Sequence, residues 1–216
     1  MPDPADLYLT LDCSGEGGTR ARETLLTALA AAPVSTVLLT PGPGGRIDAA
    51  LAKDLIGLGQ KKSVAMLIAD DVALARSLKA DGVHLTWSKD QLTRYRAARE
   101  HLGSHAIVGA DAGRSRHDAM ELAEAGADYV AFGIPPHVED KPTARQRQTD
   151  LVSWWSEIFE VPCVAMDVQG QEDAAGLYAT GADFVAVSLP VAASADELIA
   201  FVHAIAAGGT TIETPA

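Results

Sequence analysis

Short apolar runs alternate along the chain with longer segments in which apolar residues recur at helical spacing. Residues 64–68 form one such run, which is too short for a surface helix but suits a strand buried on both faces. Asp70 and Asp71 follow this run, and either can cap a following helix whose apolar positions 72, 74, 75 and 78 give it one core-facing side. A second short strand follows at residues 82–85, so the segment predicts a βαβ unit in a parallel sheet covered by helices.

The same alternation continues along most of the chain. We expect strands at residues 7–11, 34–39, 64–68, 82–85, 106–110, 129–132, 163–166 and 184–187, with about eight helices after them. Eight such repeats fit a (β/α)8 TIM barrel in a single domain over residues 1–207, followed by a flexible C-terminal tail at residues 208–216. A doubly wound open sheet of the same elements is the alternative fold.

Aspartates recur at equivalent positions of the predicted strands. The first, third, fifth and seventh strands end at Asp12, Asp70, Asp111 and Asp167. An Ala-Asp pair precedes the fourth, sixth and eighth strands, with the aspartates at positions 81, 128 and 183. In a barrel the first set lies at the carboxyl-terminal mouth, where active sites form, and the second lies on the opposite face, where such features serve stability.

Two further segments carry local predictions. Residues 134–148 form the longest predicted connection, which indicates a functional lid or a disordered loop, and Lys141, Arg145 and Arg147 gather basic charge there. This cluster could clamp an anion or simply be solvated. Capping-box spacing places helix starts at Ser88 with Gln91 and at Ser194 with Glu197.

Composition narrows the range of partners and environments. The 216 residues are 48% hydrophobic, which is enough for one sizeable core. A net charge of -12 argues against nucleic acid or an anionic membrane as the main partner. No apolar run is long enough to cross a membrane and no signal peptide is recognisable, so we expect a cytoplasmic protein with Cys13 and Cys163 as ordinary reduced thiols.

From residue 7 to about residue 205 the chain resembles the thiamine phosphate synthase superfamily, which includes the thiazole tautomerases. The resemblance rests on YLTLD, on ADDVALARSLKADGVHL, on GADYVAFG with its lysine loop, and on GADFVAVSLP, and ADGVHL is its most specific piece. It implies a (β/α)8 barrel and, in the synthase branch, magnesium-assisted joining of a pyrimidine diphosphate to a thiazole phosphate with loss of pyrophosphate. It is also consistent with a homodimer.

Some active-site residues of the family have matching residues in this chain, and others are replaced. Asp70 matches the aspartate after strand three, Lys141 the lysine of the family's loop, and Ser188 the serine at the end of strand eight. The polar and cationic residues that grip diphosphate at strand two are replaced by Leu38, Thr40 and Gly42. The Gly-Gly phosphate turn after strand seven has become Asp167-Val168, and a tautomerase histidine after Gly133 has become Ile134.

Several side chains at the predicted mouth could carry chemistry. Asp70 and Asp111 could hold Mg²⁺, because hard cations favour carboxylate oxygens, or each could merely cap the helix that follows it. His84 shares the strand face of Gly82 and Thr86 and could point into the barrel as an acid or base, or sit there as a core histidine. Trp87 could stack on an aromatic ligand or plug the pocket.

Two functions follow from these observations. The first is a divergent thiamine phosphate synthase-like enzyme, with Asp70, Lys141 and His84 as catalytic candidates, Ser188 in ligand binding and the diphosphate chemistry impaired or changed. Its small-molecule ligand would bind at the carboxyl-terminal mouth. The second is a catalytically lapsed barrel that binds a ligand or a protein partner, because a mouth ringed by carboxylates would repel diphosphate unless a divalent metal intervened.

Overall fold

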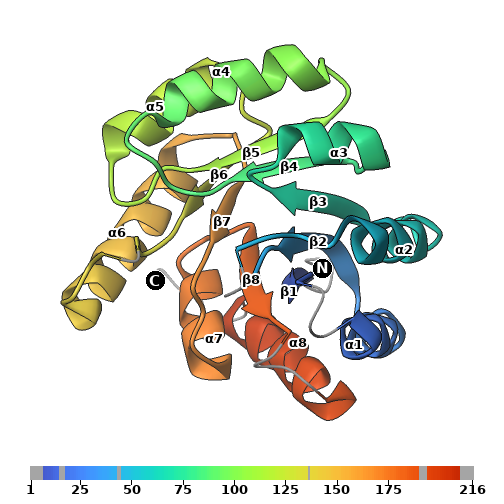
Figure 1. Ribbon diagram of the computed structural model, residues 1–216. Helices are drawn as coiled ribbons and strands as arrows, with labels where there is room; N and C mark the ends of the chain where they lie inside the picture. The colour runs from blue at the N-terminus through green and yellow to red at the C-terminus, as the bar shows by residue number, and fades with distance from the viewer. Residues whose placement is uncertain (1–6, 15–17, 43–44, 136, 190–193, 210–216) are drawn as a thin grey trace.

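Eight parallel strands close into a barrel in which each strand pairs with the next and β8 returns to β1 (Figure 1). The computed structural model describes residues 7–14, 18–42, 45–135, 137–189 and 194–209. The strands are β1 (Leu7–Asp12), β2 (Val34–Thr40), β3 (Ala65–Ala69), β4 (Gly82–Leu85), β5 (Ile107–Asp111), β6 (Tyr129–Phe132), β7 (Cys163–Ala165) and β8 (Phe184–Ser188). The predicted (β/α)8 barrel is confirmed.

A helix follows every strand and packs on the outside of the barrel (Figure 1). The helices are α1 (Gly18–Ala31), α2 (Ala49–Gln60), α3 (Val72–Leu78), α4 (Gln91–Leu102), α5 (Arg116–Glu124), α6 (Lys141–Ile158), α7 (Gln171–Ala179) and α8 (Ala195–Gly209). The helix amino termini therefore lie at the same end as the strand carboxyl termini, and this end forms the mouth.

Two apolar layers make up the core. One layer joins the outward strand faces to the helices, and it includes Leu9, Ile68 and the fully buried Trp155. The other fills the barrel interior with Tyr8, Leu38, Leu67, Tyr129 and Val164, among others. Because successive residues of a strand point to opposite faces, strands buried on both sides must be apolar throughout, as the short runs in the sequence are.

The Ala-Asp pairs have a structural role at the amino-terminal face. Each aspartate side chain accepts a hydrogen bond from a backbone N–H near the start of the strand before its own. Asp81 bonds Met66 N at 2.8 Å, Asp128 bonds Val108 N at 2.7 Å, and Asp183 bonds Cys163 N at 2.8 Å. The repeat in the sequence thus ties β3, β5 and β7 to the strands that follow them.

The structure corrects the expectation of a long loop at residues 134–148. Helix α6 starts at Lys141, because the Asp140 side chain caps its first turn at Thr143 N and Pro142 occupies a position where a missing N–H costs nothing. The helix then buries Ala144, Gln148 and Leu151 along one side. Lys141, Arg145 and Arg147 therefore lie on a helix, and only residues 133–140 connect it to β6.

Of the two predicted capping boxes, the one at α8 is confirmed and the one at α4 is wrong. Ser194 and Glu197 bond each other's backbone N–H groups, as predicted for α8. Ser88 does not cap α4: the helix begins after Asp90, and the Ser88 hydroxyl donates to the Asp90 carboxylate instead. Helix α8 runs to Gly209, and residues 210–216 of the predicted tail lie outside the described part of the chain.

Asp183 offers the simplest test of the strand clamps. Replacing it by alanine leaves Cys163 N without its side-chain acceptor, so we expect the free energy of unfolding to fall by roughly 1–3 kcal/mol. Asp183→Asn keeps an acceptor oxygen and should lose less. Urea denaturation of the three proteins measures the difference, and equal stability of the alanine variant and the parent would contradict the role assigned to the clamp.

Candidate active site

Four aspartates lie where the odd-numbered strands end, at the mouth of the barrel. Asp12 and Asp111 are the last residues of β1 and β5, whereas Asp70 and Asp167 come just after β3 and β7. Asp70 and Asp167 both have left-handed backbones with φ of 59°, a conformation that aspartate tolerates better than most residues. The predicted ring of strand-end carboxylates is thus present, but its members have different neighbours.

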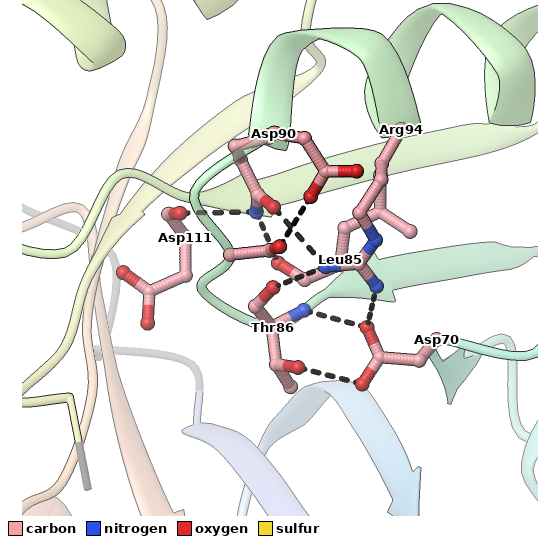
Figure 2. A network of polar contacts seen from close by, with 8 residues as sticks. Asp70, Leu85, Thr86, Asp90, Arg94 and Asp111 are labelled. Atoms are coloured by element: carbon pink, nitrogen blue, oxygen red, sulfur yellow. Dashed lines mark hydrogen bonds and ion pairs between the residues drawn. The ribbon is translucent and has the colours of Figure 1, made fainter. Parts of the chain in front are cut away.

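Asp70 is the centre of a polar network that joins β3 to the β4–α4 connection (Figure 2). One carboxylate oxygen accepts hydrogen bonds from Thr86 N at 2.9 Å and from the Arg94 guanidinium at 2.6 Å. The other accepts from the Thr86 hydroxyl at 2.6 Å. Arg94 also donates to Thr86 O at 2.8 Å, so the arginine and the threonine together hold the carboxylate in place.

This network bears on the predicted magnesium site at Asp70 and Asp111. Both oxygens of Asp70 already accept hydrogen bonds, and Arg94 supplies a positive charge where a metal ion would sit. In Figure 2 the Asp111 carboxylate points away from Asp70. The described residues also contain no group of three or more His, Cys, Asp or Glu side chains placed to hold a metal together. The side chains as arranged therefore do not fit a preformed Mg²⁺ site.

Asp111 instead faces Asp167 across Gly133. A Cβ atom added to Gly133 would lie 2.5 Å from an Asp111 oxygen and 3.1 Å from an Asp167 oxygen, so only glycine leaves room for both carboxylates. Asp111 accepts hydrogen bonds from Gly113 N at 2.7 Å and Gly133 N at 3.1 Å, and Asp167 accepts from Ile134 N at 2.7 Å. Asp111 is thus not the cap of α5, a role that Ser115 fills.

Burial raises the pKa of the Asp111 carboxyl to about 7. The two backbone N–H groups favour its ionised form and oppose this shift, whereas the negative charge of Asp167 reinforces it. A carboxyl group that titrates near neutral pH can both give and accept a proton under physiological conditions. Asp111 is therefore the strongest acid–base candidate at this mouth.

Two buried glutamines fasten the strand ends beneath these carboxylates. Gln91 of α4 donates to Leu85 O at 2.8 Å and Asp111 O at 3.0 Å, and Gln148 of α6 donates to Phe132 O and to Met166 O at 2.8 Å. Each glutamine oxygen accepts in turn from an arginine of its own helix, Arg94 or Arg145. The two arginines at the mouth thus have structural partners as well as positive charge.

His84 lies fully buried inside the barrel, below Asp70. Its Nδ1 is 2.9 Å from the Tyr129 hydroxyl, which is 3.0 Å from the Tyr8 hydroxyl. Burial lowers the pKa of His84 to about 4, so the ring is neutral at pH 7. Its Nε2 is buried without a hydrogen-bond partner among the described residues, which leaves one ring nitrogen unused. The structure thus places His84 in the barrel interior, and its predicted catalytic role stays a prediction.

The remaining candidates lie around the rim. Lys141 is exposed at the start of α6, and Ser188 is half-buried at the end of β8, where it pairs with Thr10 of β1. Trp87 packs against His137 with ring centroids 5.1 Å apart and would collide with any side chain at Gly113. These positions are compatible with ligand binding at the mouth but leave the roles of Lys141 and Ser188 as predictions.

The sequence did not single out Arg94 or Gln148, and it suggested Gln91 only as a capping-box partner of Ser88. In the structure all three side chains turn toward the strand ends, a contact that the polar pattern of their helices does not indicate. The spacing does hold a signal, since a glutamine and an arginine stand three residues apart in both α4 and α6. The order is reversed between the two helices, so no simple motif repeats.

Replacing Asp111 by asparagine should remove a pH dependence of stability. Between the ordinary carboxyl pKa near 4 and the folded value near 7, the native state holds a proton that the unfolded chain has released, so the free energy of unfolding falls as pH rises. Asparagine keeps the acceptor for Gly113 and Gly133 without the charge. We expect Asp111→Asn to gain roughly 1–3 kcal/mol at pH 8 and little at pH 4, measured by urea denaturation. An equal effect at both pH values would contradict the raised pKa.

Among the residues that the structure describes, no helix is both long and apolar enough to cross a bilayer.

Comparison with solved structures supports the fold of the chain. In structure, the chain is similar to a thiamine phosphate pyrophosphorylase from Pyrococcus furiosus, with a TM-score of 0.72 and 18% identity over 95% of this chain and 98% of that one. It is also similar to a Mycobacterium tuberculosis tryptophan synthase chain, with a TM-score of 0.67 and 16% identity over 95% and 92%. These likenesses show the barrel fold.

Sequence comparison is more specific. The chain is 40% identical over 188 residues to the thiamine-phosphate synthase of Erythrobacter litoralis, which covers 86% of this chain and 87% of the relative. It is 38% identical over 172 residues to that of Hyphomonas neptunium, covering 77% and 76%. The family model described as thiamine monophosphate synthase matches residues 7–191, from β1 to beyond β8. The chain belongs to the thiamine monophosphate synthase family.

Proposed function

We propose that this chain is a thiamine phosphate synthase, a transferase that joins a pyrimidine diphosphate to a thiazole phosphate and releases pyrophosphate. The observation that carries the proposal is the 40% identity to a thiamine-phosphate synthase over 86% of the chain. The family match over residues 7–191 supports it, because that range runs from β1 to beyond β8 and includes every strand end at the mouth. Such continuous similarity supports a shared reaction more strongly than the fold alone, because one barrel fold serves many chemistries.

The residues at the mouth could take different roles in this reaction. Lys141, exposed at the amino terminus of α6, would attract the diphosphate through its charge and the positive end of the helix. Asp111, with its pKa near 7, would exchange a proton with the pyrimidine ring as the bond to diphosphate breaks and the bond to the thiazole forms. Ser188 would hydrogen-bond the thiazole phosphate at the end of β8, and Asp70 would hold the β4–α4 connection against the substrate.

We also infer that this chain grips diphosphate differently from its relatives. By the resemblance, the family's polar and cationic positions on strand two are here Leu38, which is buried, and Thr40 and Gly42, which carry no charge. Gly42 lies directly against the Asp12 carboxylate, so an anion at this edge would meet negative charge. We expect weak diphosphate binding, and a requirement for magnesium or another divalent cation stays a prediction.

A second candidate is a lapsed barrel that binds a ligand or a partner without turnover. The specific observation in its favour is that Arg94 and Arg145, which donate to backbone oxygens just beyond the strand ends, are each paired with a carboxylate of this chain, Asp70 and Asp173. The positive charge of each arginine is therefore neutralised by a carboxylate of the chain itself, without a substrate. A small molecule with little charge would suit such a mouth better than a diphosphate.

Product formation from the two phosphorylated precursors tests the proposal directly. With both substrates and Mg²⁺ present, we expect the parent chain to form thiamine phosphate, and Lys141→Gln to raise KM for the diphosphate about tenfold through loss of one charge-assisted contact. Lys62→Gln is the matched control, since Lys62 is exposed beyond the end of α2 at the opposite face, and it should leave KM unchanged. The same assay with a chelator tests the magnesium requirement.

Calorimetry with each substrate alone then separates the two functions. No product and no binding of either substrate, with or without Mg²⁺, would eliminate the synthase proposal. Binding without product would favour the lapsed barrel.

We expect the active form to be a homodimer. Size-exclusion chromatography with light scattering should then give twice the mass of one chain. A monomeric peak with full activity would contradict this expectation.

The Asp70 network gives a further prediction for this reaction. Asp70→Asn removes the charge that pairs with Arg94 but keeps an oxygen for Thr86 N, so the connection should loosen without unfolding the barrel. We expect kcat/KM to fall at least tenfold while the melting temperature changes by only a few degrees, measured by the same assay and by thermal denaturation. Unchanged kcat/KM would exclude Asp70 from the site.

A further inference from the structure

A cleft of about 820 Å³ separates α5 from α6 on the outside of the barrel, near the mouth. The two helices are neighbours in Figure 1. We call this the α5/α6 cleft, and define it by Arg114, Arg116, Thr143, Gln146, Arg147 and Asp150. Its volume falls within the range typical of small-molecule sites, roughly 300–1,000 Å³.

Three arginines line the cleft with little negative charge to balance them. In the part of the chain that the structure describes, the side chains of Arg114 and Arg147 make no ion pair or hydrogen bond, and Arg116 lies 4.6 Å over the ring of Trp154. The only carboxylate that lines the cleft there, Asp150, already accepts a hydrogen bond from Gln146 at 3.0 Å. Like charges brought together in this way repel one another unless an anion joins them.

Four of the eight other arginines of this acidic chain are paired with carboxylates. Arg22, Arg94, Arg99 and Arg145 form ion pairs with Asp54, Asp70, Asp128 and Asp173. The sequence has 29 acidic and 17 basic residues, so acidic side chains outnumber basic ones. In the α5/α6 cleft, by contrast, three arginines line one cavity together with a single carboxylate among the described residues.

Helix geometry adds to the positive potential. The first turns of α5 and α6 both border the cleft, at Arg116 and at Thr143, so the positive ends of both helix dipoles lie beside it. Their amide groups are already capped, by Ser115 at Asp118 N and by Asp140 at Thr143 N. The helix dipoles thus add positive potential at the cleft. The hydrogen-bond donors for an anion would be the arginines, the Thr143 hydroxyl and the Gln146 amide.

The cleft is separate from the site at the strand ends. Arg145 lies two residues before Arg147 on α6, which places the two on opposite sides of the helix. Arg145 donates to Asp167 O at 2.6 Å on the mouth side, whereas Arg147 lines the cleft. A ligand in the cleft would therefore contact different side chains from a ligand held by Asp70 or Asp111.

We propose that the α5/α6 cleft binds a small anion of the phosphate class that carries two or more negative charges. Arginine guanidinium groups match phosphate oxygens in pairs, and three of them around one cleft suit a diphosphate group better than a single carboxylate. The net charge of -12 disfavours a long polyanion such as nucleic acid, which would extend beyond the cleft over acidic surface. The proposal does not depend on the reaction assigned to the mouth.

Calorimetric titration of the full chain with inorganic diphosphate tests this site. We expect the double variant Arg114→Gln/Arg147→Gln to bind at least tenfold more weakly than the parent, with affinity that falls as salt is raised to about 0.15 M. The control is Arg20→Gln/Arg96→Gln, which removes two exposed arginines of α1 and α4 and the same charge, and it should bind within twofold of the parent. Lys141→Gln, at the mouth, should also retain binding in the cleft.

Three results would overturn the proposal. One is the absence of any diphosphate binding by the parent chain at millimolar concentration. Another is equal loss of affinity in the cleft variant and the control variant, which would mean that net charge alone attracts the anion. The third is tighter binding of a hexaglutamate peptide than of diphosphate, which would identify the α5/α6 cleft as a docking site for an acidic protein segment instead.

Discussion

A closed parallel barrel must satisfy the backbone groups at both ends of every strand, and in this chain side chains from neighbouring elements do much of that work. At the amino-terminal face, Asp81, Asp128 and Asp183 accept from backbone amides at the first or second residue of a strand. At the mouth, Gln91 and Gln148 donate to the last strand carbonyls. Because an unpaired buried backbone group costs about as much as a lost hydrogen bond, these few residues hold the frame on which every mouth residue is placed.

The same requirement shapes the electrostatics of the mouth. Arg94 and Arg145 bond the oxygens of the structural glutamines and also pair with Asp70 and Asp173, so neither arginine offers an unshared charge to a substrate. Gly133 lets Asp111 and Asp167 approach each other, and burial together with mutual repulsion keeps Asp111 partly protonated near pH 7. The mouth thus sets four strand-end carboxylates beside two arginines that are already paired, whereas Arg114 and Arg147 of the α5/α6 cleft make no ion pair among the described residues.

Sequence reasoning was most successful where local pattern decides structure. Apolar runs such as residues 64–68 located the strands, and the family motif around His84 identified the fold. The start of α6 was missed because residues 141–147 are mostly polar, and the buried face of the helix before Leu151 consists of Ala144 and Gln148. The pairing of Asp70 with Arg94 joins residues 24 positions apart, and no local spacing encodes such a contact. The raised pKa of Asp111 depends likewise on burial and on Asp167, which only the closed barrel brings near.

The proposed function requires the mouth of this barrel to bind a pyrimidine diphosphate despite its carboxylates. A crystal structure of the chain grown with the pyrimidine diphosphate and Mg²⁺ tests this requirement. We expect density for the ligand over the strand ends, with its diphosphate toward Lys141 and its ring beside Asp111. Density for the ligand in the α5/α6 cleft alone, with none over the strand ends at a saturating concentration, would contradict it.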